Sequence, residues 1–274
     1  MSGRILAIGG AEDPDEDHME ILPYFVRMCG GSEARIIVCG APSEKPDEKE
    51  RTYDKLFQKI GVASVLHAEV RERHDADRPE LLDAARTATG IFFTGGDQLR
   101  LTALIAGTKF GDLIADRMEH DGLVIGGTSA GAAAISSTMF TGGREDGTVR
   151  RADVKLAPGL GYLRDTVVDT HFAQRGRVTR LFTVFASNPQ ILGIGIDENT
   201  AVDIEPDAGF TVIGEGAVFV FDGRVTHSNA GETKEDDVLA ITDVIAHVLP
   251  RGYGFDMETQ RPRTPEGESV ASRD

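Results

Sequence analysis

The chain has 274 residues, of which 40% are hydrophobic, and its formal net charge at pH 7 is −16. This length and composition predict one large globular domain, and the excess of acidic residues argues against a general binder of nucleic acid. The charge fits a solvated surface, or a substrate that carries positive groups.

Cysteine content and hydropathy bear on the location of the protein. Cys29 and Cys39 have no metal-ligand spacing, which favours buried thiols in a reducing compartment. No stretch approaches the ~20 apolar residues of a membrane span. The first strand pattern starts at Arg4, so we expect no signal peptide. These features predict a cytoplasmic protein without a membrane partner.

Strand-like and helix-like segments alternate in the first half of the chain. Apolar runs predict strands at 4–10, 34–40, 64–70, 90–96 and 123–129. The segments between them predict helices at 46–61, 78–88 and 99–122. Such alternation is typical of an α/β fold, a mostly parallel sheet with helices on both faces.

The second half adds further strands after a glycine-rich segment, 141–161. Strands are predicted at 165–172 and 190–204, a β-hairpin or meander at 208–223, and an amphipathic helix at 235–249. The composition beyond Arg251 favours a flexible tail. We therefore expect one α/β domain over 1–250 and a tail over 251–274.

Polar residues gather where several predicted strands end. Ligands of open α/β sheets bind beyond the carboxyl ends of the strands. The residues at such positions are Gly95, Gly96, Asp97, Gln98, Ser129, Asp169, Thr170, His171, Asp197 and Glu198. They place amide, hydroxyl, imidazole and carboxylate groups at one edge of the sheet.

The sequence GTSAG at 127–131 matches the G-x-S-x-G pattern of a nucleophile elbow. A strained strand-to-helix turn exposes the serine oxygen, and small neighbours let the chain bend without a clash. A glycine-rich serine turn can also be purely structural. The apolar run before Ser129 and the alanine-rich segment after it favour the nucleophile.

A serine nucleophile needs a general base, and the sequence offers seven histidines. Only His171 lies at a strand end beside other polar residues, so we predict that it is the base. The orienting acid should come from another strand end, which nominates Glu198. The chain order Ser, His, Glu is compatible with a triad, because triads are defined by geometry.

Three arginines, Arg175, Arg177 and Arg180, lie at the start of a predicted helix. Cations there oppose the helix dipole, by ~0.3–1 kcal/mol each, which favours a functional anion site. Arginine binds carboxylates with a bidentate fork. The alternative is a set of surface arginines paired with some of the many acids.

The chain resembles the cyanophycinases over residues 3–250. The resemblance rests on the following motifs, in this order: IGGAED, FFTGGDQLRL, GGTSAGA, DTHFAQRGRVTRL and GIDENTA. It implies a fold like that of class I glutamine amidotransferases, a homodimer, and a serine exopeptidase that degrades cyanophycin. Cyanophycin is a polyaspartate that bears arginine on each side-chain carboxyl, and the implied products are β-Asp-Arg dipeptides.

The resemblance also assigns roles residue by residue. It makes Ser129 the nucleophile, His171 the base and Glu198 the acid. The residues it places around the substrate are Gln98, Asp169, Arg175, Arg177 and Arg180. Thr170 departs from the family, whose members can carry glutamine there, and this leaves the fine specificity open.

The expected reaction is an acyl transfer through Ser129. The N–H of Ala130 and one from the Gly95–Gly96 turn, assigned to Gly96, are expected to hold the oxyanion. No metal or cofactor motif is present, so neither is expected. Two alternatives remain: an aspartyl dipeptidase of the same superfamily, and a catalytically silent protein that binds aspartate- or arginine-rich chains.

Overall fold

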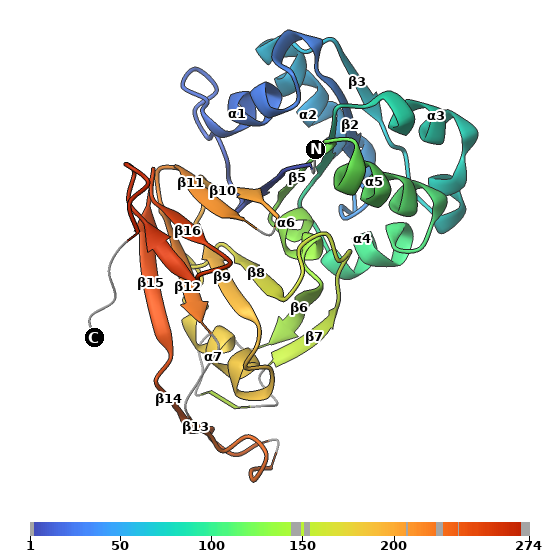
Figure 1. Cartoon of the computed structure of the whole chain (residues 1–274). Coiled ribbons are helices and arrows are strands. Elements are labelled where there is room, and N and C mark those ends of the chain that lie inside the picture. The colour runs from blue at the N-terminus through green and yellow to red at the C-terminus, as the bar shows by residue number, and fades with distance from the viewer. Residues whose placement is uncertain are drawn as a thin grey trace.

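The computed structural model describes residues 3–143, 149–150, 154–206, 208–222, 227–234 and 236–269. Its largest sheet has nine strands in the order β17-β16-β11-β10-β1-β5-β4-β2-β3 (Figure 1). In that order the strands span Arg261–Arg263, Gly254–Asp256, Gly209–Gly214, Thr200–Glu205, Ile5–Ile8, Val124–Thr128, Gly90–Phe93, Arg35–Cys39 and Ser64–His67. The neighbouring strands β1, β5, β4, β2 and β3 pair in parallel. On the other side of β1, the strands β10, β11, β16 and β17 pair antiparallel.

Helices cover both faces of the parallel half of the sheet (Figure 1). On one face lie α1 (Ile21–Met28) and α2 (Pro46–Ile60), whose Phe25 and Phe57 pack on Phe92 of β4. The other face is covered by α3 (Pro79–Thr87), α4 (Gln98–Ile105), α5 (Lys109–His120) and α6 (Ala130–Ile135). Side chains alternate between the faces along each strand, which creates two hydrophobic layers. The predicted α/β fold is confirmed, whereas the likeness to class I glutamine amidotransferases stays a prediction.

The helix predicted at 99–122 is two helices, α4 and α5. Gly107 between them has a φ of +65°, a left-handed conformation that a continuing helix does not allow. Thr108 then begins α5 as its N-cap, because its hydroxyl accepts a hydrogen bond from the N–H of Gly111 at 3.1 Å.

A second sheet has the order β15-β12-β9-β8. In that order its strands span Ile245–Pro250, Ala217–Asp222, Leu192–Ile196 and Thr166–Thr170. Helix α7 (Val178–Ser187) packs on it through Leu181 and Phe185, which join a separate hydrophobic cluster with Phe172 and Phe221. Two smaller sheets pair β6 (Thr138–Gly143) with β7 (Val154–Pro158), and β13 (His227–Ser228) with β14 (Ile241–Thr242).

Two predicted elements are each divided between the sheets. The run at 190–204 is broken after Ile196, so that β9 belongs to the second sheet and β10 to the first. Within 208–223, β11 pairs with β10 and β12 pairs with β9 and β15, so these two strands do not form a hairpin with each other. The turn 197–199 therefore lies where the two sheets meet.

The C-terminal region differs from its prediction. The described part of the predicted helix, 236–249, contains β14 and most of β15, because β14 pairs with β13 and β15 pairs along β12. In the predicted tail, β16 and β17 extend the large sheet, and Phe255 is fully buried against Phe210. Residues 270–274 of that tail lie outside the described residues.

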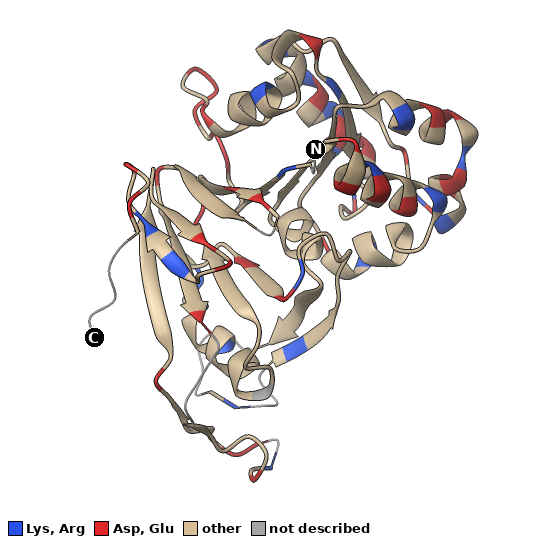
Figure 2. Ribbon diagram, viewed as in Figure 1, with Lys and Arg blue, Asp and Glu red and all other residues tan. Residues whose placement is uncertain are grey.

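Charged positions are spread along the chain. Figure 2 shows Asp and Glu on helices, strands and loops of both halves, with Lys and Arg among them. The net charge of −16 is therefore not concentrated in one segment. Among the residues described, no helix is both long and apolar enough to cross a membrane.

Candidate active site

Ser129 lies between the end of β5 and the start of α6, with φ +52° and ψ −113°. This conformation is rare for a residue with a side chain and is a source of backbone strain. The flanking glycines make it possible: a Cβ on Gly127 would lie 2.6 Å from the backbone of Gly131, and one on Gly131 would lie 2.4 Å from the carbonyl oxygen of Phe93. The geometry is that of a nucleophile elbow.

The three residues predicted as a triad are in contact. The Oγ of Ser129 lies 2.8 Å from the Nε2 of His171, and the Nδ1 of His171 lies 2.6 Å from the Oε1 of Glu198. The side chain of His171 is 13% exposed and that of Glu198 is 38% exposed, so the imidazole is shielded while the carboxylate reaches solvent. The arrangement can carry a proton from the hydroxyl to the imidazole.

The end of β1 holds the three segments that carry these side chains. Three consecutive carbonyl oxygens accept hydrogen bonds from backbone N–H groups: Ile8 from Ser129 (3.0 Å), Gly9 from His171 (2.9 Å) and Gly10 from Asn199 (2.9 Å). Asn199 directly follows Glu198. The sequence motif IGGAED, which we interpret from the sequence as a strand-end loop lining the site, therefore also contributes a backbone scaffold to it.

Gly10 also sets the position of the imidazole. It has a φ of +103°, and a Cβ on it would lie 2.3 Å from the Cε1 of His171. Only glycine allows this close approach of the backbone to the ring. His171 has a positive φ of its own, +50°, as does Asn199, at +48°. Several strained residues therefore meet at one point.

One cavity beside Ser129, here called the arginine cavity, has a volume of about 270 Å³. Gly96 and Ala130, the residues expected to hold an oxyanion, line it together with Ser129. A Cβ on Gly95 would lie 3.5 Å from the Cβ of Ser129, so the Gly95–Gly96 turn is next to the nucleophile. The other predicted site residues that line the cavity are Gln98, Asp169, Thr170, His171, Arg175, Arg177 and Arg180.

Arg177 and Arg180 are buried and do not form surface pairs. Each is 7% exposed, and both pair with Asp169, which is 1% exposed. The Nη1 of Arg177 donates to Asp169 at 3.1 Å, and Arg180 donates to both carboxylate oxygens. The guanidinium of Arg180 also lies over the ring of Phe140, at 4.5 Å from its centroid. The alternative of scattered surface arginines is therefore wrong for these two.

Arg175 differs from the other two arginines. It is exposed, and its guanidinium makes no hydrogen bond or ion pair with the residues that the structure describes. Gln98 and Thr170 are held in the wall of the cavity: the Nε2 of Gln98 donates to the carbonyl of Phe140 at 2.6 Å, and the carbonyl of Thr170 accepts from Arg177 at 2.7 Å. Three arginines and one aspartate give the arginine cavity an excess of positive charge.

A second cavity, here called the Glu12 cavity, has a volume of about 930 Å³ and also reaches the nucleophile. It shares Gly96, Ser129 and His171 with the arginine cavity. Glu12 lies in its wall. It belongs to the loop after β1, beyond the carboxyl end of a strand, which the sequence indicates as a loop lining the site, but no role was predicted for Glu12 itself.

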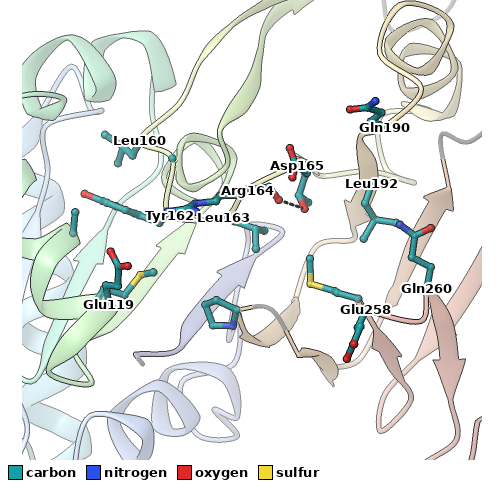
Figure 3. A pocket seen from close by; sticks show the side chains of 16 residues that line it. Glu119, Leu160, Tyr162, Leu163, Arg164, Asp165, Gln190, Leu192, Glu258 and Gln260 are labelled. Carbon is teal, nitrogen blue, oxygen red and sulfur yellow. Dashed lines mark hydrogen bonds between the residues drawn. The ribbon is translucent and has the colours of Figure 1, made fainter. Parts of the chain in front are cut away.

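A third cavity, of about 790 Å³, lies at the opposite ends of the strands (Figure 3). Thr166 and Leu192 in its wall begin β8 and β9, whereas His171 and Glu198 follow the ends of these strands. None of the predicted site residues lines it. In Figure 3, Glu119 and Tyr162 lie across the cavity from Glu258 and Gln260. Within the described ranges, no group of three or more His, Cys, Asp or Glu side chains is placed to hold a metal ion.

Comparisons with known proteins identify the family of the chain. The model of the family described as Peptidase family S51 matches residues 5–212. A cyanophycinase of Synechococcus elongatus is 37% identical over 260 residues, which cover 94% of this chain and 80% of that protein. A cyanophycinase of Geminocystis herdmanii (strain PCC 6308) is 36% identical and covers 94% of this chain and 95% of its own length.

Solved structures extend the comparison to the fold. The crystal structure of a peptidase from an acI-B1 actinobacterium is 19% identical, covers 90% of this chain and 98% of its own, and has a TM-score of 0.63. At this identity the likeness concerns the fold alone. The match to the family model and the identity with the cyanophycinases decide the family: the chain belongs to peptidase family S51, and it is a serine peptidase.

Proposed function

We propose that this peptidase is a cyanophycinase, an exopeptidase that hydrolyses cyanophycin to β-Asp-Arg dipeptides. The observation that carries the proposal is the contact of Ser129, His171 and Glu198 beside the arginine cavity. The names of the relatives, at 36–37% identity, support the substrate. The polymer offers one arginine carboxylate per aspartate, which is the kind of group that the arginine cavity attracts.

In the proposed reaction, the Nε2 of His171 accepts the proton of the Ser129 hydroxyl while Oγ attacks the carbonyl carbon after a β-Asp-Arg unit. The tetrahedral intermediate collapses, its C–N bond breaks, and the leaving amine takes the proton from His171. An acyl ester then remains on Ser129. Water attacks the ester with His171 as base, and Ser129 recovers its proton. Glu198 holds the imidazole and stabilises its charged form.

The oxyanion of the intermediate needs hydrogen-bond donors beside Ser129. We propose the backbone N–H groups of Gly96 and Ala130, whose residues line the cavity next to the nucleophile. One such donor is worth ~10²–10³ in rate. Gly96 fits this role because its φ of +150° and its contact with Pro42 exclude a side chain there.

We propose that Arg175 makes the direct contact with a substrate carboxylate. Its guanidinium is exposed and donates to no residue that the structure describes, while Arg177 and Arg180 are oriented by Asp169. Arg177 and Arg180 then supply positive potential and rigidity to the cavity. Gln98 and Thr170 shape its wall.

Incubation with purified cyanophycin, followed by mass detection of β-Asp-Arg, tests the proposal. We expect the dipeptide to accumulate with the wild-type protein and not with Ser129→Ala. Free Asp-Xaa dipeptides serve as the second substrate. Their hydrolysis without attack on the polymer would instead identify an aspartyl dipeptidase, and hydrolysis of neither would favour a silent binding protein.

We further propose a cytoplasmic homodimer with one catalytic domain. Cys29 and Cys39 are both buried and form no disulfide, as expected in a reducing compartment. The dimer is an implication of the resemblance to cyanophycinases. Sedimentation analysis tests it, and a monomer at micromolar concentration would contradict it.

A further inference from the structure

Glu12 is held in a fixed orientation in the wall of the Glu12 cavity. The hydroxyl of Tyr53 donates to its Oε1 at 2.5 Å, and the hydroxyl of Thr128 donates to its Oε2 at 2.6 Å. The pKa of Tyr53 is raised well above its usual value, mainly by burial and then by the negative charge of Glu12, so the phenol remains a hydrogen-bond donor. Thr128 directly precedes Ser129, so the hydroxyl that holds the carboxylate belongs to the neighbour of the nucleophile, and all three residues line the Glu12 cavity.

The charge of Glu12 has no counter-charge within the described part of the chain. No Lys, Arg or His nitrogen there lies within ion-pairing distance of its carboxylate, and its two partners are neutral. Neutral donors satisfy hydrogen bonds but leave the charge uncompensated. Each carboxylate oxygen also keeps acceptor capacity for a further donor.

Most other charges around the Glu12 cavity are engaged elsewhere. Lys45 and Glu48 pair with each other at 3.4 Å, and Asp97 caps the N-terminus of α4. The Nε of Arg100 donates to the carbonyl of Ala41 at 2.9 Å. Glu44 and Lys49 are exposed and carry opposite charges. Glu12 is therefore the carboxylate in this cavity that two side-chain hydroxyls orient and that makes no ion pair with the described residues.

We propose that Glu12 binds a guanidinium group of the substrate in the Glu12 cavity, on the other side of Ser129 from the carboxylate bound in the arginine cavity. The assignment rests on the proposed attack by Ser129. A carboxylate fixed by two hydroxyls matches the planar fork of a guanidinium, which is the preferred partner in bidentate pairs. In cyanophycin each unit carries both a guanidinium and a carboxylate, so two units next to the scissile bond can engage the two cavities at once.

The proposal predicts a preference among cations. A guanidinium can donate two parallel hydrogen bonds to Glu12, whereas an ammonium is a point charge on a flexible stem. Butylguanidine should therefore protect Ser129 from labelling by a small organophosphate at lower concentration than butylamine does. Neither probe carries a carboxylate, so the arginine cavity does not contribute to its binding.

The test measures this protection in the wild-type protein, in Glu12→Gln and in Glu48→Gln. Each protection is expressed relative to the labelling rate of the same variant without the probe. Glu12→Gln removes the charge and keeps the shape, and should raise the concentration of butylguanidine needed for half-protection ~10–100-fold. Glu48→Gln removes one charge from the same cavity, where Glu48 is already paired with Lys45, and should leave protection unchanged.

Equal protection by butylguanidine in the wild type and in Glu12→Gln would overturn the proposal, and so would the absence of protection in the wild type. The proposal would also fail if Glu48→Gln raised the concentration needed for half-protection as much as Glu12→Gln does. These readouts do not use cyanophycin. If protection depends on Glu12 while the polymer is not hydrolysed, the proposed function fails and the cation site stands. If the polymer is hydrolysed and protection does not depend on Glu12, only the cation site fails.

Discussion

Ser129 combines an unusual backbone conformation with a hydrogen bond to an imidazole. We expect Ser129→Ala to fold normally and to lose hydrolysis by a factor on the order of 10⁶, because no other group in the relay can attack the carbonyl. The rate of β-Asp-Arg release and the melting temperature are the measurements. A variant that keeps more than a tenth of the wild-type rate would remove Ser129 from the mechanism.

His171 and Glu198 are expected to act as one unit with Ser129. The double variant Ser129→Ala/His171→Ala should be no slower than Ser129→Ala alone, since members of a relay are not additive. Glu198→Gln should lower the rate less than Ser129→Ala or His171→Ala does, because the base and the nucleophile remain. The rate of each variant on the same polymer checks this, and additive losses would indicate independent roles.

The three arginines should separate into one that binds substrate and two that also stabilise the fold. Arg175→Ala removes an exposed guanidinium without a partner among the described residues, so we expect kcat/KM to fall roughly 10–150-fold at an unchanged melting temperature. Arg180→Ala removes one of the two guanidinium partners of the buried Asp169 carboxylate, so part of its negative charge is left unpaired. We expect this to destabilise the fold by about 3 kcal/mol.

The melting temperatures of these two variants are the decisive comparison. Arg175→Lys serves as the control for charge, and it should recover only part of kcat/KM because lysine lacks the planar fork. Normal hydrolysis by Arg175→Ala would exclude it as a substrate contact. An unchanged melting temperature of Arg180→Ala would show that the pair with Asp169 contributes little.

At the scale of elements, the site depends on the loop after β1. Gly10→Ala adds a Cβ at 2.3 Å from the ring of His171, so the imidazole cannot keep its position and its hydrogen bond to Ser129 is expected to be disturbed. We expect kcat to fall at least tenfold with a smaller change in KM, since a misplaced base affects the chemical step. The measurement is steady-state hydrolysis of the polymer.

Gly61→Ala is the matched control for this prediction. Gly61 has a φ of +97°, close to that of Gly10, but a Cβ there would meet nothing within 4 Å. The two variants therefore share the backbone strain and differ in the contact with His171. If kcat fell as much in Gly61→Ala as in Gly10→Ala, backbone strain and not the position of the imidazole would explain the loss.

Elements with strong local signals could be predicted from the sequence. Pro46 at the start of α2 and Gly61 in a left-handed C-cap fix the ends of that helix locally. The segment 241–248 was predicted as helix because its apolar residues also fit helical spacing. Its strand conformation comes from the pairing of β14 with β13 and of β15 with β12, and no local pattern contains these earlier strands.

The site shows the same division. Ser129, His171 and Glu198 could be predicted because each follows an apolar strand run. The role of Glu12 could not, because its partners Tyr53 and Thr128 lie 41 and 116 residues away along the chain. The burial of Arg177 and Arg180 could not be predicted either, since it depends on how α7 packs over β8 and Phe140.

At the scale of the whole molecule, the two cysteines report on the two hydrophobic layers of the large sheet. Cys29 belongs to the layer under α1 and α2, and Cys39 to the layer under α3–α6. Burial raises the pKa of both thiols, that of Cys39 to about 12. Because the thiolate is the reactive form, neither thiol should react with a thiol reagent in the native protein.

Under increasing denaturant, both thiols should become reactive at the same midpoint if the two layers unfold as one cooperative unit. The site spans both the large sheet, through Ser129, and the second sheet, through His171, so hydrolysis should be lost at that midpoint as well. Cys29→Ala and Cys39→Ala assign the two thiol signals. Two separate midpoints would contradict the proposed single catalytic domain, and loss of hydrolysis before either thiol reacts would mean that the second sheet unfolds before the large one.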